Sequence, residues 1–324
     1  MPDDDAKKKG VMDTVSENKG MPEDGLLLAD AGGSKTDWIF VCDGKASRFT
    51  AAGMNLAVMG KEAVLAAVLS AAESMGDMAA RVMDIRYYGA GVIGSGHVIE
   101  LDAVLKNVFP GASVSYGSDL LLAAEAGLGN GSGIICILGT GSNSGMYDGR
   151  KIVSNIRPGG YILGDEGGGS ALGRMLLSDY VKGRLPESIM EKFSAAYPGL
   201  SYSVVVEHVY RGGNPAGYLA SFAPFVLSCR GDGYADGLID RNLRNFVERS
   251  VLPYGRADCD IAVSGSMGVE CRKELERLGR EYGLHFIRFV KSPADVLAQR
   301  ILEAVPCPEE RQTGKSGGDD PEEY

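Results

Sequence analysis

The sequence predicts an α/β fold in which one unit, with the element order βββαβαβα, occurs twice in tandem. Strand and helix patterns alternate along residues 25–305. Both halves of this body open with three short strands, and in both a glycine-rich turn follows the first strand. Helices and strands then alternate in the same order. Two such units imply two similar lobes with a cleft between them.

The first unit begins at residue 25. Short apolar runs bounded by turn residues predict its strands. Residues 61–75 predict a helix, because their apolar side chains recur at three- and four-residue spacing. In chain order we expect strands at 26–29, 37–41 and 46–50, a helix at 61–75, a strand at 85–88, a helix at 97–108, a strand at 112–116 and a helix from Asp119.

The second unit repeats this order and carries a helical insertion, in which residues 235–246 form a clear apolar stripe. We expect an N-terminal lobe at 25–117 and a C-terminal lobe at 118–305. The elements predicted for the second unit are strands at 133–138, 144–147 and 151–154, a helix from about 169, a strand at 261–263, a helix at 268–282, a strand at 285–290 and a helix from Pro293.

The composition is that of a soluble globular protein, with 44% hydrophobic and 23% charged residues. The formal net charge of −10 argues against nucleic acid or an anionic membrane as a partner. No signal peptide is recognised and no apolar run reaches the ~18–20 residues that span a bilayer. The expected location is therefore the cytoplasm. The six cysteines form no Cys-x-x-Cys pair, and no metal cluster is predicted.

Both ends of the chain are expected to be disordered. Residues 1–24 and 306–324 are rich in charged residues, Gly and Pro and have few large apolar side chains. The second segment contains Gly314-Lys315-Ser316, which superficially matches a P-loop. A true P-loop has another Gly five residues before its second Gly, but position 309 is Glu.

Residues 89–94 fit the Gly-x-Gly-x-x-Gly fingerprint of dinucleotide-binding proteins by letter. That fingerprint belongs in the first strand–turn–helix of its domain. Here three strands and a helix are predicted before it. We therefore interpret this segment as a glycine hinge at the floor of the cleft, with NAD binding as the alternative.

Two turns have the composition of a phosphate clamp. The first, Asp30-Ala31-Gly32-Gly33-Ser34-Lys35-Thr36, joins the first two strands, and Gly139-Thr140-Gly141-Ser142-Asn143 occupies the same place in the second half. Glycines let backbone N–H groups converge on an oxyanion, and the hydroxyl and Lys side chains add donors and charge. Asp30, at the end of the first strand, can hold a hydrated Mg²⁺. The alternative is a pair of glycine hairpins with solvated side chains.

These turns belong to a longer series of segments that spans nearly all of 25–305 and resembles one family. Besides the two turns, these segments are Gly53-Met54-Asn55, Tyr88-Gly89-Ala90-Gly91, Ser118-Asp119, Gly164-Asp165-Glu166-Gly167 and Ser264-Gly265-Ser266. With the segments in this order, the chain resembles the BadF/BadG/BcrA/BcrD ATPase family and, within it, the N-acetylglucosamine kinases of the sugar kinase and actin superfamily. The resemblance implies a ribonuclease H-like (actin-like ATPase) fold with a central cleft for ATP and substrate.

The resemblance also implies a role for each matched residue. The implied activity is ATP- and Mg²⁺-dependent phosphorylation of an amino sugar such as N-acetylglucosamine at its 6-hydroxyl. Whether the protein forms a homodimer is left open. Asp119 matches the general base. The ATP-binding positions are Gly32, Gly33, Ser34, Lys35, Thr36, Gly139, Thr140, Gly141, Ser142, Gly265 and Ser266. The sugar-binding positions are Asn55, Asn143, Asp165 and Glu166.

Some features leave other interpretations open. Asp119 could serve only as a helix cap behind Ser118, and residues 164–169 could be a flexible loop before a helix. Tyr161 and Met54 depart from the family pattern, which leaves the choice of sugar undecided. Two other functions stay possible on the same fold. One is an ATPase switch like the iron–sulfur activators of acyl-CoA dehydratases, although no matched segment contains Cys, and the other is a non-catalytic sugar-binding regulator.

Overall fold

The computed structural model describes residues 25–32, 35–54, 59–89, 92, 95–256 and 258–304, which form two compact units. The N-terminal unit contains the described residues up to Tyr116 and residues 294–304. The C-terminal unit contains residues 117–293. The predicted disordered ends, most of the glycine segment 89–94 and Gly314-Lys315-Ser316 lie outside the described residues.

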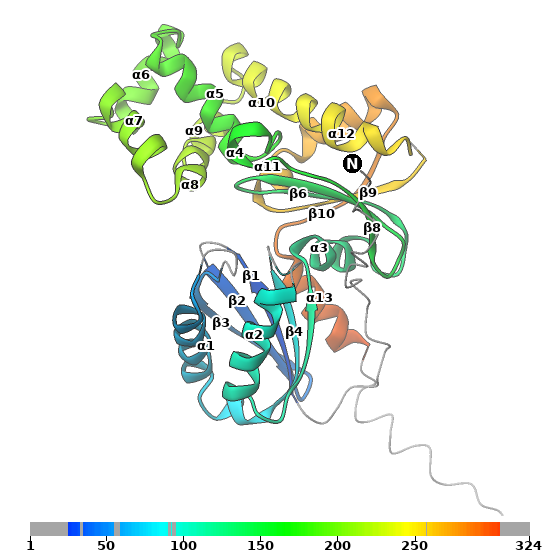
Figure 1. The fold of residues 1–324 in the computed structure, drawn as a ribbon. Helices are drawn as coiled ribbons and strands as arrows, with labels where there is room; N and C mark the ends of the chain where they lie inside the picture. The colour runs from blue at the N-terminus through cyan, green and yellow to red at the C-terminus, as the bar shows by residue number, and fades with distance from the viewer. Residues whose placement is uncertain are drawn as a thin grey trace, which may run out of the picture. The chain divides into compact units, whose positions relative to one another are not determined.

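The sheet of the N-terminal unit has the strand order β3-β2-β1-β4-β5 (Figure 1). β1 pairs antiparallel with β2 and parallel with β4, and β2 pairs antiparallel with β3. Apolar side chains of α1 and α2 join those of β1, β2 and β4 in one core, around Trp38 and Tyr87. The elements are β1 (Gly25–Ala31), β2 (Lys35–Cys42), β3 (Lys45–Ala52), α1 (Lys61–Met75), β4 (Val82–Gly89), α2 (Ser95–Val108) and β5 (Ser113–Gly117).

The sheet of the C-terminal unit has the order β10-β9-β6-β7-β8, which is the same arrangement read from the opposite edge. The pairing also matches, because β6 is antiparallel to β7 and parallel to β9. The predicted duplication of one α/β unit is thus confirmed. The strands are β6 (Gly133–Leu138), β7 (Ser142–Tyr147), β8 (Ile152–Ile156), β9 (Asp260–Ser264) and β10 (His285–Val290).

The last helix of the chain, α13 (Pro293–Glu303), belongs to the N-terminal unit, whereas the sequence analysis assigned all of 118–305 to the second lobe. It buries Ala294, Leu297 and Ala298, and Asp295 accepts a hydrogen bond from Arg48 on β3 at 2.9 Å. Helix α3 (Asp119–Leu128) instead packs on the sheet of the C-terminal unit. An apolar stripe predicts such a helix but does not say which of two sheets it covers.

The predicted insertion is present and is larger than its one clear stripe indicated. Its core is aromatic: the rings of Phe193 and Tyr197 contact each other, and both contact the rings of Phe222 and Phe225. The helix expected at 268–282 is broken at the buried Cys271 into α11 (Ser266–Glu270) and α12 (Arg272–Tyr282). Two helices precede the insertion, α4 (Gly160–Leu163) and α5 (Gly169–Val181), and α5 is the helix expected from about 169. The insertion contains α6 (Glu187–Ala196), α7 (Tyr202–Arg211), α8 (Pro215–Ala220), α9 (Ala223–Ser228) and α10 (Gly233–Phe246).

One helical stretch in the described chain, Lys61–Arg81, is long and apolar enough to cross a membrane by length and composition. The sequence analysis found no run of that length. The stretch consists of α1 and a 3₁₀ helix, and α1 buries five side chains, Val64, Ala67, Val68, Ala71 and Met75. A core helix of a globular protein meets the same criterion, so the stretch is weak evidence for a membrane span.

Candidate active site

The turn between β6 and β7 is fixed against the start of α5. Gly139 N–H donates to the carbonyl of Gly141 at 2.9 Å, which closes the turn. The first two N–H groups of α5, from Gly169 and Ser170, donate to the carbonyls of Gly139 and Thr140, both at 2.8 Å. α5 has no side-chain cap, so the turn satisfies donors that a helix N-terminus otherwise leaves unpaired.

The turn after β9 lies against the same place. Gly265 has φ +101°, a conformation that side chains disfavour, and a Cβ there would lie 2.4 Å from the carbonyl oxygen of Leu138. Its N–H donates to Val290 at 2.9 Å. The predicted ATP-binding segments 139–142 and 265–266 are thus brought together at the ends of neighbouring strands β6 and β9.

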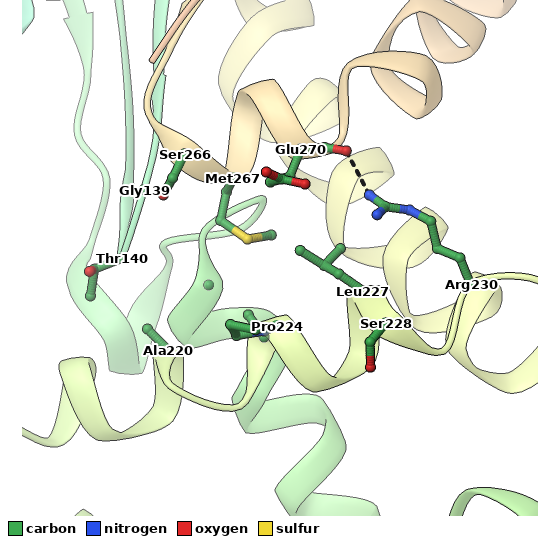
Figure 2. Close-up of a pocket in the computed structure, with 12 residues that line it drawn as sticks. Gly139, Thr140, Ala220, Pro224, Leu227, Ser228, Arg230, Ser266, Met267 and Glu270 are labelled. Atoms are coloured by element: carbon green, nitrogen blue, oxygen red, sulfur yellow. Dashed lines mark hydrogen bonds between the residues drawn. The ribbon is translucent and has the colours of Figure 1, made fainter. Parts of the chain in front are cut away.

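A cavity of about 520 Å³ begins at these two turns and runs between the insertion and α11 (Figure 2). Gly139, Thr140 and Ser266 form one end. Its middle is apolar, and the far end carries polar and charged groups. The remaining lining residues are Gly169, Ala220, Ala223, Pro224, Leu227 and Met267, followed by Ser228, Arg230 and Glu270.

The predicted sugar-binding loop packs on the same turn. Asp165 is buried with φ +56°, and its Oδ1 accepts from Ser142 N–H at 3.4 Å. Burial raises the pKa of this carboxyl above its ordinary value; the Ser142 N–H opposes that rise and the neighbouring Glu166 adds to it. A Cβ on Gly141 would lie 2.7 Å from Oδ2 of Asp165. Only glycine therefore lets the carboxylate approach the turn this closely.

Two further predicted sugar ligands have well-defined partners. Oδ1 of Asn143 accepts from Ser144 N–H at 2.9 Å and from Asn155 Nδ2 at 2.8 Å. Both bonds use the oxygen, and among the described residues the Nδ2 hydrogens of Asn143 have no hydrogen-bond partner. Glu166 accepts from Arg249 Nη1 at 2.5 Å, which holds the glutamate in place. Asn143 can therefore donate to a ligand, and Glu166 can accept.

Asn242 on α10 positions the loop, and the sequence analysis did not identify it. Its side chain is buried; Oδ1 accepts from Gly167 N–H at 2.9 Å and Nδ2 donates to the Gly168 carbonyl at 3.2 Å. Asn242 lies within the apolar stripe predicted over residues 235–246. A single Asn in that stripe was the one feature of the sequence that could have indicated its role. Both amide groups are used, so Asn242 ties the loop to α10.

Replacing Asn242 with alanine should lower the free energy of unfolding by about 1–3 kcal/mol, because it leaves the N–H of Gly167 unpaired and removes one of the two donors to the Gly168 carbonyl. It should also raise the KM of any substrate held by Asp165. Urea denaturation and steady-state kinetics measure the two effects. Asn245→Ala, on the same helix and only half-buried, is the control. Equal stability of the two variants would contradict the role given to Asn242.

Asp119 is the first residue of α3, and the helix is capped by Ser118, whose Oγ accepts from Leu121 N–H at 3.1 Å. The Asp119 carboxylate accepts from the adjacent Leu120 N–H at 2.9 Å. No side chain in the described part of the chain hydrogen-bonds to the Asp119 carboxylate. Burial raises the pKa of Asp119 above its ordinary value, and the Leu120 N–H only partly offsets this. The capping role is filled by Ser118, and the half-buried Asp119 has no side-chain partner among the described residues.

The N-terminal unit places two carboxylates side by side. Asp30 on β1 is the direct cross-strand partner of Asp37 on β2. Asp37 accepts from Lys35 Nζ at 2.7 Å and from Thr50 Oγ1 at 2.9 Å. Burial alone would raise the pKa of Asp37, but these bonds and the nearby Arg48 hold it below its ordinary value. Asp37, which the sequence analysis did not single out, therefore stays charged and orients Lys35.

The first predicted phosphate turn is described only in part. Gly32 N–H donates to the Lys35 carbonyl at 3.0 Å, and the Gly32 carbonyl accepts from Met54 N–H at 3.1 Å. The Thr36 side chain is fully buried, and its Oγ1 has no hydrogen-bond partner among the described residues. The predicted ligands Gly33, Ser34 and Asn55 lie outside the described residues.

Comparison with known proteins yields matches among solved structures. No protein-family model and no curated protein matches the chain. A protein from Porphyromonas gingivalis, solved under the name putative N-acetylglucosamine kinase, has a TM-score of 0.82 and 34% identity, covering 86% of this chain and 99% of that one. A protein of the same name from Chromobacterium violaceum has a TM-score of 0.66 and 23% identity, covering 87% and 100%, and shows the fold alone.

The first of these relatives matches this chain over almost its full length. The fold agrees as well, since the duplicated mixed sheets found here are those of the actin-like ATPase fold. The predicted resemblance to the N-acetylglucosamine kinases is therefore confirmed, whereas membership of the wider BadF/BadG/BcrA/BcrD family stays a prediction. This chain belongs to the N-acetylglucosamine kinase-like family of proteins with the actin-like ATPase fold.

Proposed function

We propose that this protein is an ATP-dependent kinase that transfers the γ-phosphoryl group to the 6-hydroxyl of an amino sugar such as N-acetylglucosamine. The similarity to the Porphyromonas gingivalis protein, at 34% identity over 99% of that chain, is the observation that carries the proposal. The cavity between the insertion and α11 supports it, because its apolar middle suits a purine and its glycine turns suit phosphates.

The residues that bind the sugar, in this proposal, are Asn143, Asp165 and Glu166, together with Asn55. A sugar presents many hydroxyls, which need both donors and acceptors. Asn143 offers an amide donor, and the two carboxylates offer acceptors. Asp165 is buried and accepts from the Ser142 N–H, so its carboxylate is held in place before the sugar binds. It can therefore orient a sugar hydroxyl at no further cost in side-chain entropy.

Asp119 accepts the proton of the attacking hydroxyl. Its carboxylate lies at the N-terminus of α3 and has no partner except the adjacent backbone N–H among the described residues. The raised pKa makes it a stronger base than an exposed aspartate while leaving the ionised form available at higher pH. Phosphoryl transfer then depends on in-line positioning and on donors around the phosphates, which we assign to Gly32–Thr36, 139–142 and Gly265–Ser266.

ATP in this family implies Mg²⁺, and the residues present fit that ion. Asp30 provides a hard oxygen ligand at the end of β1, and a cross-strand pair of carboxylates is unfavourable without cations nearby. Lys35 and Arg48 pair with Asp37, and we assign Asp30 to the metal because of its place at the end of β1. The ion, when bound, neutralises phosphate charge. The same proposal places the enzyme in the cytoplasm. It also includes a homodimer, which size-exclusion chromatography with light scattering would test.

Release of ADP with a panel of sugars tests the proposal. The panel contains N-acetylglucosamine, N-acetylmannosamine, glucosamine and glucose, each at saturating ATP and Mg²⁺. We expect turnover to be highest with an amino sugar, and negligible ADP release without sugar. ADP release that no sugar stimulates would favour an ATPase switch, and sugar binding without ADP release would favour a regulator.

A further inference from the structure

Two charged residues line the cavity, Arg230 and Glu270, and no predicted role explains either; Glu270 is the acidic one (Figure 2). It is the last residue of α11, four residues after Ser266. Residues four apart on a helix share one face and are one turn, about 5.4 Å, apart. Ser266 lies at the end of the cavity formed with Gly139 and Thr140, where we place the phosphates. Glu270 therefore lies one turn farther from the phosphates on the same wall.

Arg230, from the insertion, holds this end of α11 in place. Its Nη2 donates to the Glu270 carbonyl at 2.7 Å, and its Nε donates to Glu274 at 2.8 Å. The guanidinium thus closes the helix where it breaks before α12. The first bond uses the backbone carbonyl of Glu270 and the second the side chain of Glu274, so neither involves the side chain of Glu270. Among the described residues, the Glu270 carboxylate has no hydrogen-bond partner.

The chemistry of the carboxylate limits what it can bind. An ionised carboxylate accepts hydrogen bonds only, and it repels phosphates. The flat, apolar base is matched instead by the wall made by Pro224, Leu227 and Met267. Beyond its phosphates, the first part of a nucleotide is the ribose, whose neighbouring 2′- and 3′-hydroxyls are two neutral donors.

We propose that Glu270 accepts a hydrogen bond from the 2′-hydroxyl of the nucleotide's ribose and makes the enzyme select ribonucleotides over 2′-deoxyribonucleotides. This inference rests on the nucleotide site of the proposed function. Arg230 acts as a positioning residue, because it fixes the helix end that carries Glu270.

Calorimetric titration of the full chain with ADP and with 2′-deoxyADP, in the presence of Mg²⁺ and without sugar, tests the inference. The wild type should bind ADP about tenfold more tightly, as expected for a hydrogen bond to a charged group. Glu270→Ala should weaken ADP binding about tenfold and leave 2′-deoxyADP binding almost unchanged. Glu270→Gln retains an acceptor oxygen and should keep part of the preference.

Glu276→Ala is the matched control, because Glu276 is a glutamate on α12 that pairs with Arg272 and does not line the cavity. It should keep the wild-type preference. Equal binding of the two nucleotides by the wild type, or equal weakening of both by Glu270→Ala, would overturn the role in ribose selection and leave the nucleotide site intact. Failure of the wild type to bind either nucleotide would overturn this inference and the ATP site together.

Discussion

Replacing Asp119 with asparagine should lower kcat by roughly 10²–10⁴, the usual weight of general-base catalysis, with little change in sugar affinity. Asparagine keeps the shape of the side chain and can still accept the Leu120 N–H through its amide oxygen. It cannot take up the proton of the attacking hydroxyl. Steady-state kinetics with the preferred sugar from the panel separate kcat from KM.

Stability gives an independent measure of the same substitution. Because burial raises the pKa of Asp119, the folded state binds more protons than the unfolded state between the ordinary pKa of 3.8 and the raised one. Stability contributed by this group therefore falls as the pH rises through that window, and the ionised form destabilises the fold at neutral pH. Asp119→Asn should thus raise the Tm at pH 7 while it lowers kcat. The wild-type rate should fall on acidification through the raised pKa.

Ser118→Ala is the control for a purely structural role. It removes the side-chain cap on Leu121 N–H and should cost about 1 kcal/mol of stability, with kcat near that of the wild type. If Asp119→Asn left kcat near normal on a good sugar substrate, Asp119 would not be the base, although the nucleotide site would stand.

Replacing Asp30 with asparagine should reduce activity by about 10–100-fold at limiting Mg²⁺, the usual effect of losing a group that supports a bound metal. The charge of Asp30 is what the proposed ion requires, and asparagine preserves the shape of the strand end. Excess Mg²⁺ should restore part of the rate, because the variant weakens metal binding rather than folding. EDTA should abolish the activity of the wild type, because it removes Mg²⁺. Activity measured against Mg²⁺ concentration gives the apparent metal affinity of each protein.

Asp43→Asn is the matched control for Asp30. Asp43 lies in the turn between β2 and β3, pairs with Arg81 and has φ +51°, a conformation that asparagine tolerates. It should leave the Mg²⁺ dependence unchanged. An unchanged Mg²⁺ dependence in Asp30→Asn as well would remove Asp30 from the metal site.

Much of the fold could be predicted because local periodicity was clear. The helix predicted at 61–75 is observed at Lys61–Met75, and the strand predicted at 133–138 is observed at Gly133–Leu138. The assignment of α13 to the N-terminal unit could not be predicted, because its apolar stripe fits either sheet. The break at Cys271 has no Gly or Pro at that residue to signal it, and Arg230, which closes it, is 40 residues from Glu270.

In the candidate site, too, some residues could be predicted from the sequence and others could not. The glycine turns could be found because their residue types follow strand ends, and Asp165 because its segment, Gly164-Asp165-Glu166-Gly167, resembles the family. Asn242 could not, because its bond to Gly167 joins residues 75 positions apart. The role of Asp119 was undecided in the sequence, where it could equally be the helix cap. The hydrogen bond between Ser118 and Leu121 shows that Ser118 is the N-cap, and the role of Asp119 as general base stays a prediction.

The most direct test of the central claim is to identify the product made from ATP and N-acetylglucosamine. Mass spectrometry and phosphorus NMR, run together with ADP quantification, give the product and the stoichiometry. We predict one phosphosugar for each ADP, with the phosphate coupled to the protons on C6, and no phosphosugar from Asp119→Asn within the same time. ADP without phosphosugar, or no reaction with any sugar of the panel, would contradict the assignment as an amino-sugar kinase.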